Sequence, residues 1–162
     1  KNSNIAIGVV SLQNINFQSK SAEIAINASS PNKGIAHPFS TLEAMALIVQ
    51  HAFEEVGLTR IFGGQAYPVL RSWNKMIELI GFKSEGVLKK SFVRGQKFED
   101  TVCISCLYSD YLALKEIRGS LWGSSEVIKC TMKRQPKISF ADILSNKLVE
   151  LEKDYFSFLF EE

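Results

Sequence analysis

A strand, a glycine-containing loop and a helix follow one another early in the chain, and this succession could bind an anion. Residues 21–27 alternate apolar and polar side chains, which is typical of a strand with one buried face. In the following loop, PNKGIAH, Gly34 allows backbone angles that turn consecutive N–H groups toward one anion, and Lys33 adds a positive charge. A helix beginning at Ser40 and Thr41 would add the positive end of its dipole. The alternative is an ordinary loop with a single turn glycine.

The helix after this loop has a recognisable start, buried face and end. Ser40 and Glu43 have the spacing of a capping box, in which the Ser40 hydroxyl accepts a hydrogen bond from the backbone N–H of Glu43. Gly57 is expected to end the helix. The predicted apolar face consists of Leu42, Met45, Val49, Ala52, Phe53 and Val56.

Strand and helix patterns continue along the chain and change in character after about residue 114. The predicted strands are residues 5–17, 21–27, 60–66, 82–92, 98–108 and 126–132. The predicted helices are residues 40–56, residues 68–80 and a last helix capped by Ser139 and Asp142. This last helix ends in YFSFLF, and its apolar side is expected to pack on the same domain or to contact another subunit or partner.

Composition sets the broad class of the protein. Of 162 residues, 46% are hydrophobic, which is enough for one domain with a sizeable core. A net charge of +2 indicates no surface for nucleic acid, and no apolar run is long enough to cross a membrane. No signal peptide is visible, so we expect a cytoplasmic protein. The chain begins with Lys1 instead of Met, as a piece of a longer protein would.

The cysteines indicate neither a disulfide framework nor a metal site. Cys103 and Cys106 form a Cys-x-x-Cys motif, but on a strand this spacing places the two thiols on opposite faces. No second cysteine pair or histidine pair completes a zinc site. We therefore expect two ordinary strand cysteines and no bound metal.

Residues 40–86 resemble the GCN5-related N-acetyltransferase (GNAT) family, in particular its RimJ/RimL-like branch of ribosomal-protein acetyltransferases. The pattern EA…HAF…VGLTRI…IGFKSEG carries the resemblance, which extends over residues 5–114. It implies an α/β fold with a mixed, mostly antiparallel sheet flanked by helices, lacking the family's usual N-terminal strand and helices. Residues 1–118 would form the acetyltransferase-like core, and residues 119–162 would form a C-terminal helical appendage, a strand plus an amphipathic helix.

The resemblance also implies a reaction, the transfer of an acetyl group from acetyl-CoA to a primary amine by direct attack in a ternary complex. The loop and the helix start would hold the pyrophosphate of CoA, and the strand before them would hold its pantetheine arm. The expected cofactor-binding residues are Ile26, Asn27, Ala28, Lys33, Gly34, Ile35, Ala36, Ser40, Thr41 and Asn74.

Three side chains are candidates for the chemistry. Glu23 lies on the polar face of its strand and could take a proton from the acceptor ammonium; a solvated strand-face glutamate is an equal alternative. Ser72 or Tyr67 could protonate the departing thiolate, unless Tyr67 only packs and Ser72 only caps its helix. A backbone N–H near Asn27 could stabilise the oxyanion.

The sequence also departs from the family pattern in ways that favour other functions. Pro31 stands where the family loop has arginine or glutamine, and the family's serine position in the following helix falls on Trp73. These departures favour a non-catalytic CoA-binding or assembly module. A second alternative is the acetyltransferase part of a larger multidomain enzyme. A small-molecule amine and a peptide amine both remain candidate acceptors, and a homo-oligomer is an open possibility.

Overall fold

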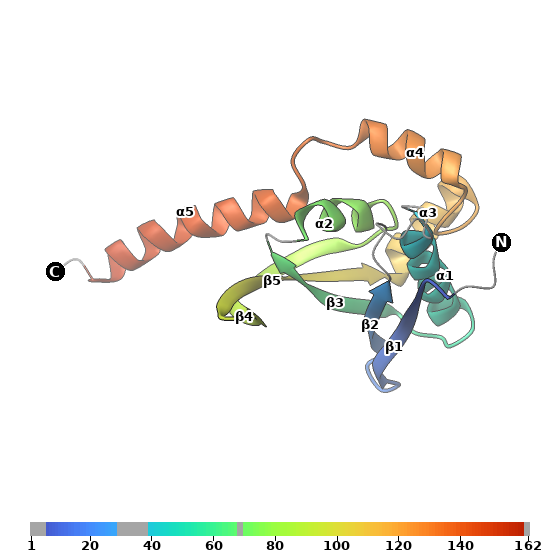
Figure 1. Cartoon of the computed structure of the whole chain (residues 1–162), viewed down its shortest axis with the longest axis horizontal. Coiled ribbons are helices and arrows are strands. Elements are labelled where there is room, and N and C mark those ends of the chain that lie inside the picture. Colours follow the sequence, from blue (N-terminus) through green and yellow to red (C-terminus); the bar gives the residue numbers. More distant parts are fainter. Residues whose placement is uncertain (1–5, 29–38, 68–69, 161–162) are drawn as a thin grey trace.

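A five-stranded sheet forms the centre of the molecule (Figure 1). The computed structural model describes residues 6–28, 39–67 and 70–160. The strands are β1 (Gly8–Asn16), β2 (Ser21–Ala28), β3 (Arg60–Tyr67), β4 (Lys83–Arg94) and β5 (Lys97–Leu107). They lie in the order β1-β2-β3-β5-β4, with β2 and β3 parallel and the other neighbouring pairs antiparallel. The predicted mixed, mostly antiparallel sheet is confirmed.

Five helices flank this sheet in the part of the chain that the structure describes. They are α1 (Ser40–Glu54), α2 (Arg71–Glu78), α3 (Tyr108–Arg118), α4 (Ser125–Arg134) and α5 (Phe140–Phe160). Helix α1 connects β2 to β3, and α2 connects β3 to β4. The strands β2 and β3 have the same direction, and so do β3 and β4. Both connections also move toward the β4 edge of the sheet, so right-handed crossovers place α1 and α2 on one face. None of the described helices is long and apolar enough to cross a membrane.

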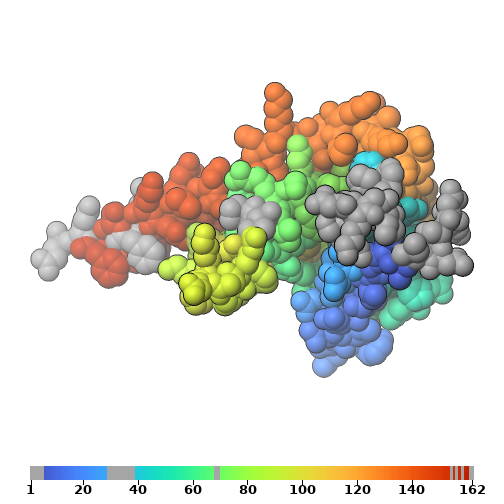
Figure 2. Space-filling view, viewed as in Figure 1, coloured from blue at the N-terminus to red at the C-terminus, as the bar shows by residue number. Residues whose placement is uncertain are grey.

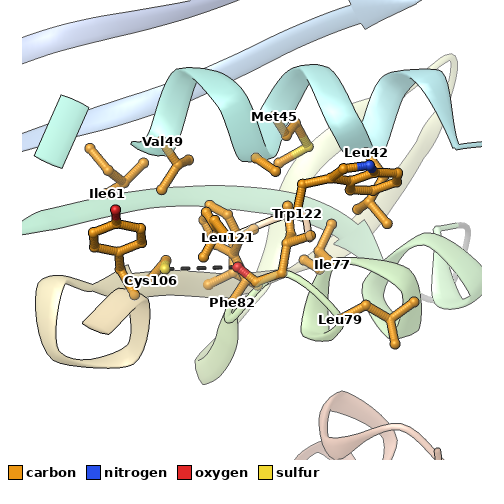
Figure 3. Close-up of a cluster of buried hydrophobic side chains, with 14 of the residues drawn as sticks. Leu42, Met45, Val49, Ile61, Ile77, Leu79, Phe82, Cys106, Leu121 and Trp122 are labelled. Atoms are coloured by element: carbon orange, nitrogen blue, oxygen red, sulfur yellow. Dashed lines mark hydrogen bonds between the residues drawn. The ribbon is translucent and has the colours of Figure 1, made fainter. Parts of the chain in front are cut away.

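The hydrophobic core lies between that face and the two helices. The strand register aligns Ala22 with Ile61 and Ile61 with Cys106, so these side chains share a face, and all three are fully buried. Figure 3 shows Leu42, Met45 and Val49 on the side of α1 that faces the sheet, and all three are buried. Burying one large aliphatic side chain contributes about 1.5–3 kcal/mol. The apolar face predicted for the first helix is therefore the face that packs on the sheet.

The two ends of α1 differ in how well the sequence predicts them. Gly57 adopts φ +76°, a left-handed conformation that ends the helix as expected. The capping box at Ser40 is wrong, because Ser40 is itself the first helical residue. The backbone N–H of Glu43 donates to the carbonyl of Phe39 at 2.8 Å, so it does not need the Ser40 hydroxyl.

The predicted strand over residues 126–132 is also wrong, because α4 occupies this segment. Ser124 is the N-cap, and its hydroxyl oxygen accepts a hydrogen bond from the N–H of Val127 at 3.3 Å. Lys133 and Arg134 lie in the last turn, where positive charge is favourable. The Ser124 cap and the basic last turn thus favour a helix more strongly than the β-branched residues of this segment favour a strand.

Helix α5 begins as the sequence predicts and extends beyond the sheet. The Asp142 N–H donates to the Ser139 hydroxyl at 3.1 Å, and this hydroxyl donates to the Asp142 carboxylate at 2.9 Å. The Tyr67 hydroxyl donates to the same carboxylate at 2.6 Å, which fixes the start of α5 against β3. Figure 2 shows the later part of α5 projecting from the body of the molecule, beyond the β4–β5 hairpin.

Candidate active site

The parallel strands β2 and β3 stay together over only part of their lengths. Their ladder ends at the pair Glu23–Phe62, whereas β2 continues to Ala28 and β3 to Tyr67. The two strands diverge beyond this pair (Figure 1). Backbone N–H and C=O groups that face the gap therefore form no bond from one strand to the other, as far as the described residues extend. A ligand in the gap can use these groups.

A cleft of about 300 Å³ occupies the gap between the strands. Met45 of α1 and Ile104 of β5 line it, as do Leu70 and Trp73 at the start of α2. Glu23 contributes a carboxylate to this mostly apolar lining. The described residues that complete the lining are Ile24, Ala25, Ile26, Gly63, Gly64 and Gln65.

A second pocket, of about 90 Å³, lies where β2 ends and α1 begins. Asn27 and Ala28 line it from β2, Ser40 and Thr41 line it from α1, and Ile26 lines both this pocket and the cleft. The positive dipole end of α1 favours an anion here. The structure thus brings together five of the expected cofactor-binding residues. The expected residues Lys33, Gly34, Ile35 and Ala36 lie outside the described part of the chain.

Glu23 lies where the cleft begins, at the last pair that joins β2 and β3. Its Oε2 accepts a hydrogen bond from Nδ2 of Asn14 at 2.7 Å. Asn14 has φ +48°, within the β1 irregularity between Gln13 and Asn16. Asparagine tolerates this left-handed conformation better than most residues do. The sequence analysis missed Asn14; an asparagine within a predicted strand is the available signal for such a bulge.

The other expected site residues do not line the cleft. Ser72 is exposed in the first turn of α2, and no side chain caps that helix. Asn74 is only 2% exposed, and neither polar atom of its side chain has a hydrogen-bond partner among the described residues. Trp73, which lies between them in sequence, is the residue that reaches the cleft.

Tyr67 is turned toward α5, which corrects its expected role as a proton donor. Its hydroxyl donates to Oδ1 of Asp142, and Arg71 forms an ion pair with the same carboxylate at 2.7 Å. Burial raises the pKa of Asp142, but the hydrogen bonds from Tyr67 and Ser139 and the charge of Arg71 more than offset this, so the pKa lies below its usual value. The Tyr67 hydroxyl therefore fixes a helix in place and is not directed at a thiolate in the cleft.

An ion pair braces the strands beside the cleft. The Arg60 guanidinium on β3 reaches across β5 and donates two hydrogen bonds to the Glu85 carboxylate on β4. The Ser105 hydroxyl of β5 donates to the same carboxylate at 2.6 Å. The hydrogen bonds from Arg60, and then that from Ser105, lower the pKa of Glu85 to about 2. This network joins β3, β4 and β5, and Arg60 also lies in the short ladder that pairs β3 with β2.

The sheet order, the single parallel pair and the flanking helices give the chain the fold of the GNAT acetyltransferases. Among solved structures it is similar to the spermidine/spermine N-acetyltransferase SpeG from Vibrio cholerae in complex with manganese ions. That match has 26% sequence identity and a TM-score of 0.59, and it covers 67% of this chain and 61% of that chain.

Two further solved structures agree. A dodecameric spermidine N-acetyltransferase from Vibrio cholerae has 26% identity and a TM-score of 0.58, covering 65% of this chain and 60% of that chain. A protein described as a probable acetyltransferase has 25% identity and a TM-score of 0.57, covering 65% of this chain and 56% of that one. The chain thus spans less than two thirds of the length of these structures. No protein-family model and no curated protein matches the chain.

Proposed function

We propose that the protein is an acetyl-CoA-dependent N-acetyltransferase that acts on a primary amine. The observation that carries this proposal is the end of the β2–β3 ladder at Glu23 and Phe62, with a cleft beyond it that shares Ile26 with the pocket at the start of α1. The pocket suits the pyrophosphate of CoA, and the cleft suits its pantetheine arm. The thioester would then lie near Glu23.

In the proposed mechanism this chain positions two reactants and moves one proton. The acceptor amine is an ammonium ion at neutral pH, and Glu23 takes its proton, directly or through one water. The Asn14 amide holds the Glu23 carboxylate in place. A backbone N–H of β2 that faces the gap stabilises negative charge on the carbonyl oxygen. Acetyl-CoA supplies the acetyl group, and holding it beside the amine in one cleft accounts for much of the acceleration.

The described residues of the cleft lining carry no hydroxyl group that could protonate the departing thiolate. Ser72, next to Trp73 in sequence, remains the candidate hydroxyl on α2, and water from the open cleft is the other proton source.

The proposal also names the class of amine that accepts the acetyl group. The solved neighbours described as spermidine N-acetyltransferases favour a polyamine, and the sequence resemblance to the RimJ/RimL-like branch favours a protein N-terminus. We propose a polyamine or peptide amine acceptor, and a homo-oligomer as in the dodecameric neighbour. We also propose residues 1–118 as the catalytic core and residues 119–162 as a docked appendage, because Leu121, Trp122 and Ile128 reach the core.

A mass-spectrometric assay tests this function directly. The protein is incubated with acetyl-CoA and, separately, spermidine or a peptide with a free N-terminus, and acetylated product is quantified over time. We expect product with one of these amines, and much less with a Glu23→Gln variant. CoA binding without product from either amine would instead support the non-catalytic CoA-binding module.

A further inference from the structure

The apolar side of α5 extends further than the body of the molecule that covers its start. Leu148, Leu151 and Leu159 have spacings that place them on one side of the helix. Leu148 is half-buried, whereas Leu151 and Leu159 are each 52% exposed. Glu152 forms an ion pair with Lys89 of β4 at 4.0 Å, and the helix continues for about 12 Å beyond this point (Figure 2). We call residues 149–160 the α5 surface.

The end of the β4–β5 hairpin, residues 88–98, is a second exposed apolar surface, which we call the hairpin surface. All of its residues are exposed. Its large apolar side chains are 43–67% exposed, and they are Leu88, Phe92, Val93 and Phe98. An exposed group of this size usually marks a contact. The β4–β5 register shifts between Leu88 and Phe92, which makes this edge unsuited to pairing with another strand. A partner would therefore pack on the side chains.

The two surfaces differ in charge. The hairpin surface has four lysine or arginine residues and no acidic residue, whereas residues 149–162 have five acidic residues and one lysine. Within one chain, Lys89 and Glu152 form the only ion pair between the two surfaces among the described residues. Lys90 and Lys97 form no ion pair with any described residue. Each surface thus has the charge that would attract the other surface of a second molecule.

We propose that two copies of this chain associate, with the hairpin surface of each packed on the α5 surface of the other. A two-fold axis repeats the contact, so both basic surfaces meet acidic ones. Together the two surfaces supply roughly the 20–30 residues that one side of a standard interface needs. A nucleic acid or an anionic membrane fits less well, because the acidic α5 beside the hairpin would repel it. This contact gives the proposed homo-oligomer a surface and does not depend on the acetyl-transfer reaction.

Size-exclusion chromatography with light scattering, over a series of concentrations of the full chain, tests the apolar part of the contact. The wild-type protein should self-associate. Phe98→Ser on the hairpin surface and Leu151→Gln on the α5 surface should each raise the dissociation constant about tenfold or more. Ile117→Gln on α3 is the matched control at a side chain that is 79% exposed, and it should leave the dissociation constant unchanged.

A charge-reversal pair tests whether the contact joins two molecules. The first variant carries Lys90→Glu and Lys97→Glu, and the second carries Glu150→Lys and Glu152→Lys. Each alone would place like charges together in both halves of the pair and should associate at least tenfold more weakly than the wild type. Mixing the two variants should restore association, because both halves of the mixed pair then match. All four side chains are exposed, so the melting temperatures should stay near the wild-type value.

Several results would overturn the proposal. A wild-type protein that stays monomeric at every concentration would do so. Self-association that Phe98→Ser and Leu151→Gln leave unchanged would place the contact elsewhere on the molecule. Two charge-reversal variants that stay monomeric when mixed would show that the surfaces do not meet between copies. Binding of a wild-type monomer to anionic lipid vesicles, lost in the variant with Lys90→Glu and Lys97→Glu, would assign the hairpin surface to a membrane instead.

Discussion

Glu23 of β2 lies opposite Phe62 of β3, and this is the last pair before the two parallel strands separate. A strand pair that opens within its own length exposes backbone groups that a regular sheet would use internally. The separation also places Glu23 at a cleft that shares Ile26 with the pocket at the N-terminus of α1. One irregularity in the sheet thus opens a cleft beside Glu23.

The role of Glu23 as the base predicts a specific kinetic change. Glu23→Gln should lower turnover roughly a hundredfold or more while acetyl-CoA affinity stays nearly intact. Glutamine can still accept the hydrogen bond from Asn14, so the fold should not change. Equal turnover of the two proteins would reduce Glu23 to a strand-face residue.

Charge at the start of α1 should affect binding and stability in opposite directions. Thr41→Glu adds a negative charge to the first turn, which stabilises a helix by about 0.3–1 kcal/mol. The same charge should repel phosphate and weaken CoA binding by about tenfold or more. Leu47→Glu on the exposed side of α1 is the matched control and should leave CoA affinity unchanged. Tighter or equal CoA binding by Thr41→Glu, measured by calorimetry, would remove the anion site from this pocket.

Tyr67 should behave as a structural residue. Tyr67→Phe removes the hydrogen bond to Asp142 and should cost about 1 kcal/mol of unfolding free energy in urea titrations. Turnover and CoA affinity should stay within about twofold of the wild-type values, because the hydroxyl is turned toward α5. A loss of turnover near that of Glu23→Gln would restore Tyr67 to the catalytic machinery.

The segment after Gly119 should be needed for stability. Leu121 is fully buried, and Trp122 packs edge-on against Phe39 at a ring-centroid distance of 6.4 Å. Leu121→Ala should therefore cost about 2–5 kcal/mol, whereas Ile117→Ala, at a side chain that is 79% exposed, should cost less than about 0.5 kcal/mol. Deleting the chain from Gly119 onward should lower the melting temperature or cause aggregation. A truncated protein with unchanged melting temperature would mean that this segment serves an outside partner.

Protonation of the Glu85 carboxylate should lower the stability of the protein at acid pH. Its pKa is lowered from 4.5 to about 2 in the folded protein, so its stabilisation is fully present above about pH 4.5 and is lost as pH falls toward 2. Both members of the pair with Arg60 are 38% exposed, so solvent screening limits the contribution to about 1 kcal/mol or less. Glu85→Gln should lower stability at pH 7 and show a smaller further loss between pH 4.5 and pH 2. An identical pH dependence of the two proteins in urea unfolding would contradict this assignment.

The parts of the fold that the sequence predicts well are those with local signals. The period of apolar residues predicts α1 and its buried face, and Gly57 marks its end. The hairpin of β4 and β5 is confirmed, with its turn at Gly95, where φ is +63°. Weaker local signals fail: the β-branched residues before Lys133 suggest a strand, but the Ser124 cap and the tertiary contacts of Ile128 produce α4. Helix α3 was not predicted at all.

The candidate site is less predictable because its parts meet across the sequence. Ser40 and Thr41 are predicted correctly to lie beside the end of β2, since a strand–loop–helix unit places them there. The direction of the Tyr67 hydroxyl depends on Asp142, far along the chain, and no local pattern contains that information. The cleft depends on the separation of β2 from β3, and the hydrogen bond from Asn14 to Glu23 depends on the β1 bulge. Both features depend on strand pairing, which single-sequence patterns do not determine.

A thermal-shift titration with acetyl-CoA, CoA and ATP, supported by calorimetry, tests the central claim most directly. The claim is that the gap between β2 and β3 binds the pantetheine arm and the start of α1 binds the pyrophosphate. At about a hundredfold over its dissociation constant, a ligand that binds only the folded protein stabilises it by about 2.7 kcal/mol. We expect a clear shift with acetyl-CoA and CoA, a smaller one or none with ATP, and a reduced CoA shift in Thr41→Glu. The absence of any shift with either CoA species at millimolar concentration would contradict the account.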